Sequence, residues 1–380
     1  YGKIKIKKWF YSLSGLIRIR RMNMPKIEEI LREAKNAGAS DVHITVGIPP
    51  KMRVNGSLVT MSYPKFMPAD TTEILLEIMN ETQRELFEER GEYDMSFSIR
   101  EMGRYRVNAY KQRGSVALAI RLVGTQIPSA EELRLPESVA DLYNRKRGLV
   151  LVTGPAGSGK STTLAAIIDM INTYRDAHVI TLEDPIEFLH QHKMSMVNQR
   201  EIGLDSENYA NALRAALRED PDVILVGEMR DLETISTAIT AAETGHLVFS
   251  TLHTMGAAST VDRMIDVFPP HQQQQIRVQL ANVLECVVSQ QLIPRADGQG
   301  RIATFEVLHA THAVRNMIRE GKAHQLNGIM QTNRRLGMMT MDESIYNCYE
   351  SGLISREHAL QFSQDPDAMA VKLGIGKSNF

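Results

Sequence analysis

Residues 154–161 read GPAGSGKS. This stretch matches the phosphate-binding pattern G-x-x-x-x-G-K-[S/T] at every fixed position. The apolar residues 148–153 before it predict a buried strand, and residues 162–170 after it have a helical pattern. A glycine-rich turn between a strand and a helix aims several backbone N–H groups, and the positive end of the helix dipole, at one point. The stretch therefore predicts a site for a triphosphate.

We expect the two last residues of this loop, Lys160 and Ser161, to have different roles. Lys160 would reach the β- and γ-phosphates, and the hydroxyl of Ser161 would ligate Mg²⁺. The alternative is a chance match in a glycine-rich turn, which the flanking strand and helix disfavour. The other residues expected to contact the nucleotide are Gly154, Ala156, Gly157, Ser158, Gly159 and Thr162.

The composition is that of an ordinary globular chain with two or three domains. The chain has 380 residues, of which 43% are hydrophobic and 23% charged. Its net charge of −1 gives no general attraction to nucleic acid, so we expect no direct nucleic-acid partner. The two cysteines, Cys286 and Cys348, lack metal-site spacing and fit a reducing cytoplasm. No apolar run reaches the roughly 18 residues of a membrane span.

Residues 1–23 differ from the rest of the chain because their charges are all basic. They could form an amphipathic membrane anchor or resemble a signal peptide with an interrupted apolar core. They could also be an extension ahead of a true start at Met22 or Met24. We favour an extension, or a disordered tail.

Residues 24–124 predict a small α+β domain with helices on one face of a sheet. The expected elements are a helix ending at Gly38, a strand at 41–46, a hairpin at 51–59, a helix at 69–87, and strands at 94–99, 104–111 and 116–123.

Residues 125–137 read as a linker, because Pro128 and Pro136 break the periodicity. From 138 to 374 we expect an α/β domain whose short apolar strands alternate with helices, as in a parallel sheet. The expected strands are 148–153, 178–183, 223–226 and 247–251. Residues 260–360 read as mostly helical.

Two acidic groups follow predicted strands. Glu228 ends an apolar strand, where its carboxylate could polarise an attacking water or support the metal through a water; the alternative is an exposed strand-end acid. Glu183, Asp184 and Glu187 follow the strand at 178–183. Carboxylates beside a triphosphate need a metal between them, so Glu183 or Glu187 could hold the metal's water shell or orient the nucleophile. The alternative is a solvated turn.

Two further groups of side chains have open interpretations. His246 and His253 lie at the two ends of the strand at 247–251, where they could be structural or could sense the γ-phosphate. Four arginines are crowded onto two strands and a turn of the first domain. They could be strand-face charges or could neutralise phosphate across an interface, as an arginine finger does. These are Arg104, Arg106, Arg113 and Arg121.

Taken in order, these motifs resemble the secretion-type hexameric ATPases, and most closely the retraction ATPases of the type IV pilus (the PilT-like, twitching-motility group). The resemblance runs from about Met24 to Gly374, although Ala156 replaces the usual threonine of the phosphate loop. Residues 313–322 are similar to a segment associated with retraction. The chain lacks the four-cysteine cluster usual in pilus-extension and type II secretion relatives. The matching segments are 37–43, 154–162, 181–188, 218–231 and 244–254.

The resemblance implies a fold and a set of partners. The first domain would be PAS-like and the second a RecA-like P-loop NTPase domain with a helical C-terminal part. Six identical subunits would form a ring in the cytoplasm, at the inner face of the cytoplasmic membrane. The ring would act on the inner-membrane platform protein of the pilus, with a paralogous retraction ATPase as a further partner.

The resemblance also implies roles for the site residues. ATP would bind between the two domains, with Lys160 and Ser161 on phosphate and Mg²⁺. Glu228, with Glu187 or Glu183, would serve the water and the metal, and both histidines would stabilise the γ-phosphate side. Arg106 and Arg121, ahead of Arg104 and Arg113, would supply positive charge. The alternatives are a pilus-extension or type II secretion ATPase, a DNA-translocating motor, or a nucleotide-regulated scaffold that does not hydrolyse.

Overall fold

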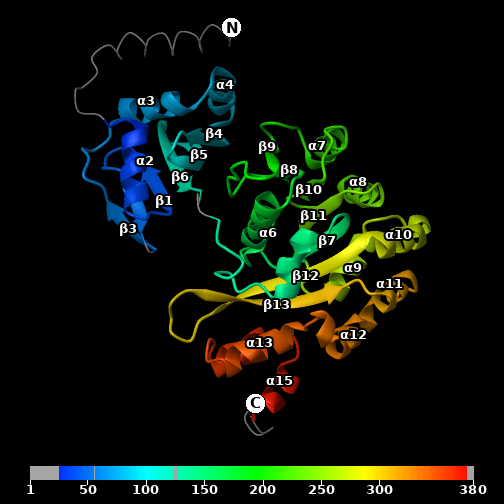
Figure 1. The fold of residues 1–380 in the computed structure, drawn as a ribbon. Helices are drawn as coiled ribbons and strands as arrows, with labels where there is room; N and C mark the ends of the chain where they lie inside the picture. The colour runs from blue at the N-terminus through cyan, green and yellow to red at the C-terminus, as the bar shows by residue number, and fades with distance from the viewer. Residues whose placement is uncertain (1–24, 55, 124–126, 375–380) are drawn as a thin grey trace. The chain divides into compact units, whose positions relative to one another are not determined.

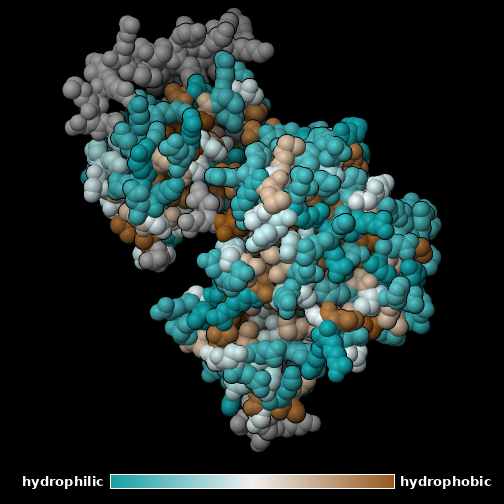
Figure 2. All heavy atoms as spheres, viewed as in Figure 1, coloured by the Kyte–Doolittle hydropathy of each residue, from teal (hydrophilic) through white to brown (hydrophobic). Residues whose placement is uncertain are grey.

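The computed structural model describes residues 25–54, 56–123 and 127–374. The chain divides into two compact units, with the boundary between residues 125 and 126 (Figure 1). The predictions made for residues 1–23 lie outside the described residues. Figure 2 shows one face of the molecule, on which hydrophilic residues predominate and apolar residues lie in small separate groups.

The first unit is built on a six-stranded antiparallel sheet with the order β3-β2-β1-β6-β5-β4. Alternate strand residues, such as Val107 and Ala109, point into one core with the helices of this unit. Its strands are β1 (Asp41–Ile44), β2 (Lys51–Val54), β3 (Ser57–Thr60), β4 (Glu92–Ile99), β5 (Gly103–Gln112) and β6 (Ser115–Leu122). Its helices are α2 (Ile27–Asn36), α3 (Pro68–Ile78) and α4 (Glu81–Arg90).

One prediction for this unit was wrong in detail. The single helix expected at 69–87 is two helices, because Asn80 begins a new one. The Asn80 side chain accepts a hydrogen bond from the amide of Gln83, and the Gln83 side chain accepts one from the amide of Asn80. This reciprocal capping starts α4 and ends the continuity of the periodic pattern.

The second unit contains a seven-stranded sheet with the order β13-β12-β7-β11-β10-β8-β9. Its strands are parallel except β13, which pairs antiparallel with β12. The four predicted parallel strands are confirmed. The strands are β7 (Gly148–Thr153), β8 (His178–Glu183), β9 (Met196–Glu201), β10 (Val223–Val226), β11 (Leu247–Leu252), β12 (Leu284–Pro294) and β13 (Arg301–His309).

Helices cover both faces of this second sheet, so its central strands are apolar on both sides. On one face, Val150 and Val152 pack with α6 (Lys160–Tyr174), α5 (Glu137–Ala140) and η1 (Asp141–Asn144). On the other face, Leu149 and Leu151 pack with a larger group of helices. These are α7 (Tyr209–Ala216), α8 (Leu232–Glu243), α9 (Ala257–Asp266), α10 (Pro270–Val283), α11 (His312–Arg319) and α12 (Leu326–Thr332), with η2 (Ala323–Gln325) between the last two.

The expectation that residues 260–360 are mostly helical was wrong for the hairpin β12–β13, which is drawn in yellow in Figure 1. Helix α10 ends at Val283 and β12 begins at Leu284, so no glycine or proline marks the change. The far end of the hairpin packs through Ile293 and Ile302 against the last helices of the chain. These are α13 (Met341–Glu350), α14 (Arg356–Phe362) and α15 (Pro366–Lys372), which follow η3 (Arg334–Leu336).

The segment 313–322 includes most of α11, which packs one side against the rest of this unit. Val314 and Ile318 are buried. The guanidinium of Arg315 donates to the carbonyls of Ala281 and Asn282 at the end of α10, and it also pairs with Glu285 at 2.8 Å. Arg315 therefore anchors α11 to the C-terminus of α10. None of the helices in the described part of the chain is both long and apolar enough to span a bilayer.

Candidate active site

The phosphate loop connects β7 to α6 at the carboxyl edge of the second sheet. Gly154 has a φ of 141° and Gly159 a φ of 88°, both in the region that favours glycine. A Cβ atom on Gly154 would lie 2.1 Å from the carbonyl oxygen of Gln290 on β12. The first glycine of the pattern is therefore required by the close approach of a neighbouring strand as well as by its backbone conformation.

Gln290 on β12 holds the phosphate loop through two hydrogen bonds. Its side chain is buried, its Nε2 donates to the carbonyl of Ser158 at 2.8 Å, and its Oε1 accepts from the hydroxyl of Thr163 at 2.7 Å. These two bonds join β12 to the loop and to the first turn of α6. Our sequence interpretation missed Gln290, because it lies in the hairpin that was expected to be helical.

A cavity of 440 Å³ opens in front of the loop. All the predicted phosphate-loop residues except Gly154 line it. Glu183, Glu187, Glu228 and His253, which come from the ends of three other strands, line it as well. This convergence is what the carboxyl edge of a parallel sheet provides. Asp184 of the predicted acidic group also lines the cavity. Further lining residues that the sequence interpretation did not single out are Pro185, Tyr209, Gly227, Thr251, Leu292 and Arg301.

Four charged or titratable side chains are connected by successive contacts, and three of them (Lys160, His253 and Glu228) line this cavity. The Nζ of Lys160 lies 3.4 Å from the Nδ1 of His253, whose Nε2 lies 3.3 Å from one carboxylate oxygen of Glu228. The other oxygen of Glu228 pairs with Arg230 at 2.7 Å. Lys160 also donates to the carbonyls of Gly154 and Pro155, at 2.9 and 3.0 Å. The ammonium thus lies within the loop it belongs to.

The surroundings of these groups shift their protonation. Burial lowers the pKa of Lys160, and the negative charges of Glu228 and Glu187 partly oppose that shift. Burial alone would raise the pKa of Glu228, but the hydrogen bond from Arg230 and the contact with His253 hold it below its ordinary value. Glu228 is therefore an anion at neutral pH, and Arg230 is a residue that our sequence interpretation missed.

The two candidate carboxylates at and after the end of β8 have different environments. Glu183 is partly buried, which raises its pKa, and it accepts hydrogen bonds from Thr181 at 2.6 Å and Gln199 at 3.1 Å. Glu187 is exposed and lines the cavity near Lys160. Of these two, Glu187 is the carboxylate open to a solvent water, whereas Glu183 is held by internal donors.

His246 does not reach the cavity. It precedes β11, at the amino end of the strand, whereas His253 follows the carboxyl end. Six strand residues separate the two ends by roughly 20 Å, at about 3.3 Å per residue. The His246 ring instead contacts the carbonyl of Ala241 at 2.9 Å and the hydroxyl of Thr244 at 3.2 Å. This corrects the expectation that both histidines stabilise the same phosphate, because only His253 follows the carboxyl edge.

The predicted arginines belong to the first unit. Arg106 and Arg121 are exposed and lie directly opposite each other on β5 and β6. The same row continues across the sheet through Asp41, which pairs with Arg121 at 3.0 Å, to Arg53. The row Arg53–Asp41–Arg121–Arg106, here called the arginine row, therefore carries three cations and one acid.

The other two predicted arginines have separate positions in this unit. Arg104 lies two residues before Arg106 on β5 and donates to the hydroxyl of Ser96 at 2.6 Å. Arg113 occupies the turn between β5 and β6, where its φ is 50°. Arg104 thus shares a side of β5 with the arginine row, whereas Arg113 lies beyond the ends of the strands.

The donor set around the cavity fits magnesium. Mg²⁺ prefers oxygen ligands, keeps several waters and is commonly held by one or two protein oxygens together with substrate phosphates. The Ser161 hydroxyl and the carboxylates of Glu183 and Glu228 line the cavity beside the phosphate loop. Within the described ranges, no group of three or more His, Cys, Asp or Glu side chains could hold a metal without a phosphate.

This geometry defines a site for hydrolysis of a nucleoside triphosphate. Comparison with known proteins shows the same class. The sequence matches the family described as "Type II/IV secretion system protein" over residues 20–362, and the chain belongs to that family. The membership inferred from the motifs is thereby confirmed.

Three relatives are particularly similar. The chain is 46% identical over 341 residues to the "Type IV pilus retractation ATPase PilT" of Pseudomonas aeruginosa, covering 90% of this chain and 99% of that protein. It is 47% identical over 321 residues to the "Twitching motility protein" of Neisseria gonorrhoeae, covering 84% of this chain and 86% of that protein. A crystal structure of the pilus retraction motor PilT with bound ADP superposes with a TM-score of 0.85 at 49% identity, covering 90% of this chain and 98% of that one.

Proposed function

We propose that this chain is an ATPase that powers retraction of type IV pili and thereby twitching motility. The observation that carries the proposal is the series of contacts Lys160–His253–Glu228 in a cavity formed by the phosphate loop. The similarity to retraction ATPases over about nine-tenths of the chain supports the biological role.

The proposed chemistry uses the loop to hold the phosphates and the carboxylates to direct water. The backbone N–H groups at the start of α6 bind the β- and γ-phosphates. Lys160 exchanges its contacts with the loop carbonyls for phosphate oxygens. Mg²⁺, when bound, would neutralise phosphate charge; the hydroxyl of Ser161 would hold it, and Glu183 and Glu228 would hold it through water. Glu228 and Glu187 orient the attacking water, and His253, which lies between Lys160 and Glu228, stabilises the γ-phosphate side of the site.

We place the nucleoside in a second cavity of 220 Å³ beside the first. The two cavities share Gly159, Thr162, Leu292 and Arg301, so a nucleotide can extend from one into the other. Apolar side chains such as Leu292 and Phe305 offer a surface for the base of the nucleotide. Arg134 offers a cation for the α-phosphate, which is attached to the ribose.

For the whole protein we propose a PAS-like domain at 24–124, a linker at 125–137 and a RecA-like ATPase domain with a helical C-terminal part at 138–374. Six copies form a cytoplasmic ring that acts on the inner-membrane platform protein of the pilus. The arginine row, with Arg104 and Arg113, supplies cations toward bound ATP. The negative charge of ATP draws the two domains together, and loss of the γ-phosphate releases them.

Substitution of Glu228 tests the chemistry. Glu228→Gln keeps the size of the side chain but removes its charge, so we expect phosphate release to fall by roughly 100-fold or more. Binding of a fluorescent ADP analogue should persist. Glu233→Gln is the matched control, because Glu233 on α8 belongs to an exposed ion pair with Arg214 on α7, and such pairs contribute little. Normal turnover in Glu228→Gln would contradict the proposed role.

A further inference from the structure

The segment between β8 and β9, residues 184–195, carries Glu187 into the cavity and has little regular structure of its own. A carboxylate on such a segment can direct a water only if its backbone is held in place. The contacts that hold this backbone come mostly from side chains of two other elements, β9 and α6.

The first half of the segment is fixed by β9. The amide of Ile186 donates to Glu201 at 3.0 Å, and the amide of His190 donates to the Oε1 of Gln199 at 2.8 Å. The Nε2 of Gln199 donates in turn to the carbonyl of Phe188 at 2.8 Å and to the carboxylate of Glu183 at 3.1 Å. Glu201 and Gln199 are two residues apart on the strand and bind alternate residues of the segment. Glu187 lies between two of these bound residues.

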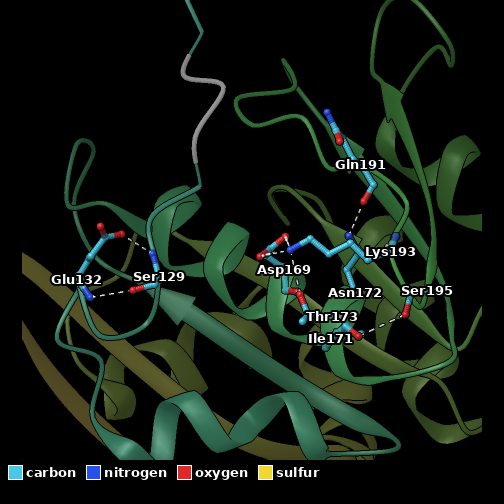
Figure 3. A network of polar contacts seen from close by, with 9 residues as sticks. All are labelled: Ser129, Glu132, Asp169, Ile171, Asn172, Thr173, Gln191, Lys193 and Ser195. Carbon is cyan, nitrogen blue, oxygen red and sulfur yellow. Dashed lines mark hydrogen bonds and ion pairs between the residues drawn. The ribbon is translucent and has the colours of Figure 1, made fainter.

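The second half is fixed by the C-terminal turn of α6, as Figure 3 shows. The side chain of Asn172 is buried; its Nδ2 donates to the carbonyl of Gln191 at 2.6 Å and its Oδ1 accepts from the amide of Lys193 at 3.1 Å. The Lys193 ammonium reaches both carboxylate oxygens of Asp169 at 2.8 Å and the hydroxyl of Thr173 at 2.9 Å. The hydroxyl of Ser195 also donates to the carbonyls of Ile171 and Arg175, at 3.3 and 2.6 Å.

The anchoring element α6 is the helix that begins at Lys160. Its first turn belongs to the phosphate loop and its last turn holds the far end of the acidic segment. The segment is thus tied at one end to the helix that carries the phosphate-binding lysine, and at the other to the edge strand β9.

We infer that Gln199 is a positioning residue for the ATPase reaction: it holds the backbone around Phe188 and His190 so that Glu187 faces Lys160 across the cavity. The inference rests on the proposed function. Gln199 does not touch the reacting atoms. Gln199 uses both its donor and its acceptor on the part of the segment next to Glu187, as Asn172 does farther along, so no aliphatic residue of similar size can replace it.

A double-mutant cycle tests this inference on the full chain. Gln199→Met keeps the length of the side chain and removes its hydrogen bonds, so the segment loosens and Glu187 loses its fixed position. We expect kcat to fall roughly 10- to 100-fold with KM for ATP changed by no more than about twofold. Because Gln199 acts through Glu187, the double variant Gln199→Met/Glu187→Ala should be no slower than Glu187→Ala alone. Additive losses would overturn the inference.

Hydrogen exchange of the nucleotide-free protein supplies a second readout. The amide of His190 should exchange faster in Gln199→Met than in the wild type, because its acceptor is gone. Gln191→Met is the matched control, since Gln191 fixes the segment through its backbone carbonyl. Unchanged exchange across residues 184–190 in Gln199→Met would also overturn the inference. If Gln199→Met does not fold, Gln199→Asn retains an amide that is one carbon shorter and should show the same coupling with a smaller loss.

The two ideas fail separately. A wild-type chain that binds but does not hydrolyse ATP would contradict the proposed function, and the exchange measurement would still decide the role of Gln199. A wild-type chain that hydrolyses ATP, with additive losses in the cycle, would contradict the inference alone.

Discussion

The two sheets of this protein present their charged side chains in different ways. In the first unit, the antiparallel sheet packs one face into a core and carries the arginine row across four neighbouring strands, with one residue on each strand. In the second unit, both faces of the sheet are covered by helices, and the charged groups gather at the carboxyl ends of β7, β8, β10 and β11.

This difference follows from the strand arrangement. In a sheet with one open face, every second residue of each strand points to that face, and residues paired across neighbouring strands point the same way. Charged side chains can therefore form a row over several strands. A sheet buried on both faces has only its loops left for polar chemistry, and parallel strands bring those loops to one edge. The first arrangement suits a broad cationic surface, and the second a site in which single groups meet at hydrogen-bonding distance.

The largest effect we expect is on stability, from a change where the phosphate loop packs against β12. Gly154→Ala would place a methyl group 2.1 Å from the carbonyl oxygen of Gln290, at a φ of 141°. We expect a loss of roughly 3 kcal/mol or more in the free energy of unfolding, from strain and overlap combined. Urea-induced unfolding without nucleotide measures this loss.

Gly157→Ala is the matched control in the same loop. A Cβ on Gly157 meets nothing within 4 Å, so only its φ of 75° opposes the change, at about 1–2 kcal/mol. Equal losses in the two variants would show that the approach of β12 does not set the requirement at the edge of the sheet.

The second prediction tests the open face of the first unit. Arg106→Ala removes one of the three cations of the arginine row while leaving the core of that unit intact. We expect kcat to fall roughly tenfold, less than for a lone arginine finger because the neighbouring Arg121 remains. Arg32→Ala is the control, because Arg32 is an exposed arginine of the same unit paired with Glu28. A normal rate in an Arg106→Ala/Arg121→Ala double variant would leave the row without a role in hydrolysis.

The third and smallest effect is a loss of folding stability in acid. We assign it to His190, in the segment between β8 and β9 of the second unit. Burial lowers the pKa of His190 from 6.5 to about 4, with Lys193 adding to the shift and Asp169 opposing it. Because the folded pKa lies below the unfolded one, the stabilisation from keeping this ring neutral is complete above about pH 6.5 and is lost as the pH falls toward 4. The loss attributable to this residue should be about 1 kcal/mol between pH 6 and pH 5.

Unfolding measured at pH 7, 6 and 5 checks this prediction. His190→Gln should flatten the pH dependence by that amount, whereas His271→Gln, at an exposed position on α10, should leave it as in the wild type. A wild-type slope in His190→Gln would place the acid-sensitive group elsewhere.

The same comparison explains what the sequence could predict. The phosphate loop is a local pattern whose strand, turn and helix are contiguous, so residues 148–170 carry the whole signal. Glu228 and Glu187 follow strands, and the logic of a parallel sheet brings them to the loop. The strand positions also separate His246 from His253, since the ends of one strand lie at opposite edges of the sheet.

Other features depend on contacts between distant parts of the chain. The strand β12 follows α10 without a breaking residue, and Gln290 acquires its role only when that strand lies beside β7. The edge strand β9 is polar, and the importance of Gln199 comes from a segment that it contacts only in the folded protein. Arg230 lies two residues after Glu228, so proximity in sequence could have suggested it.

No loop residue separates α10 from β12, because the helix ends at Val283 and the strand begins at Leu284. One end of β12 continues the helix that Arg315 clasps, its middle supports the phosphate loop through Gln290, and its far end holds the last three helices through Ile293. A displacement at any one of these three places must bend the strand or be felt at the other two. The strand β12, whose pairing with β7 shifts register between Leu284 and Cys286, thus connects the nucleotide site to the C-terminal helices.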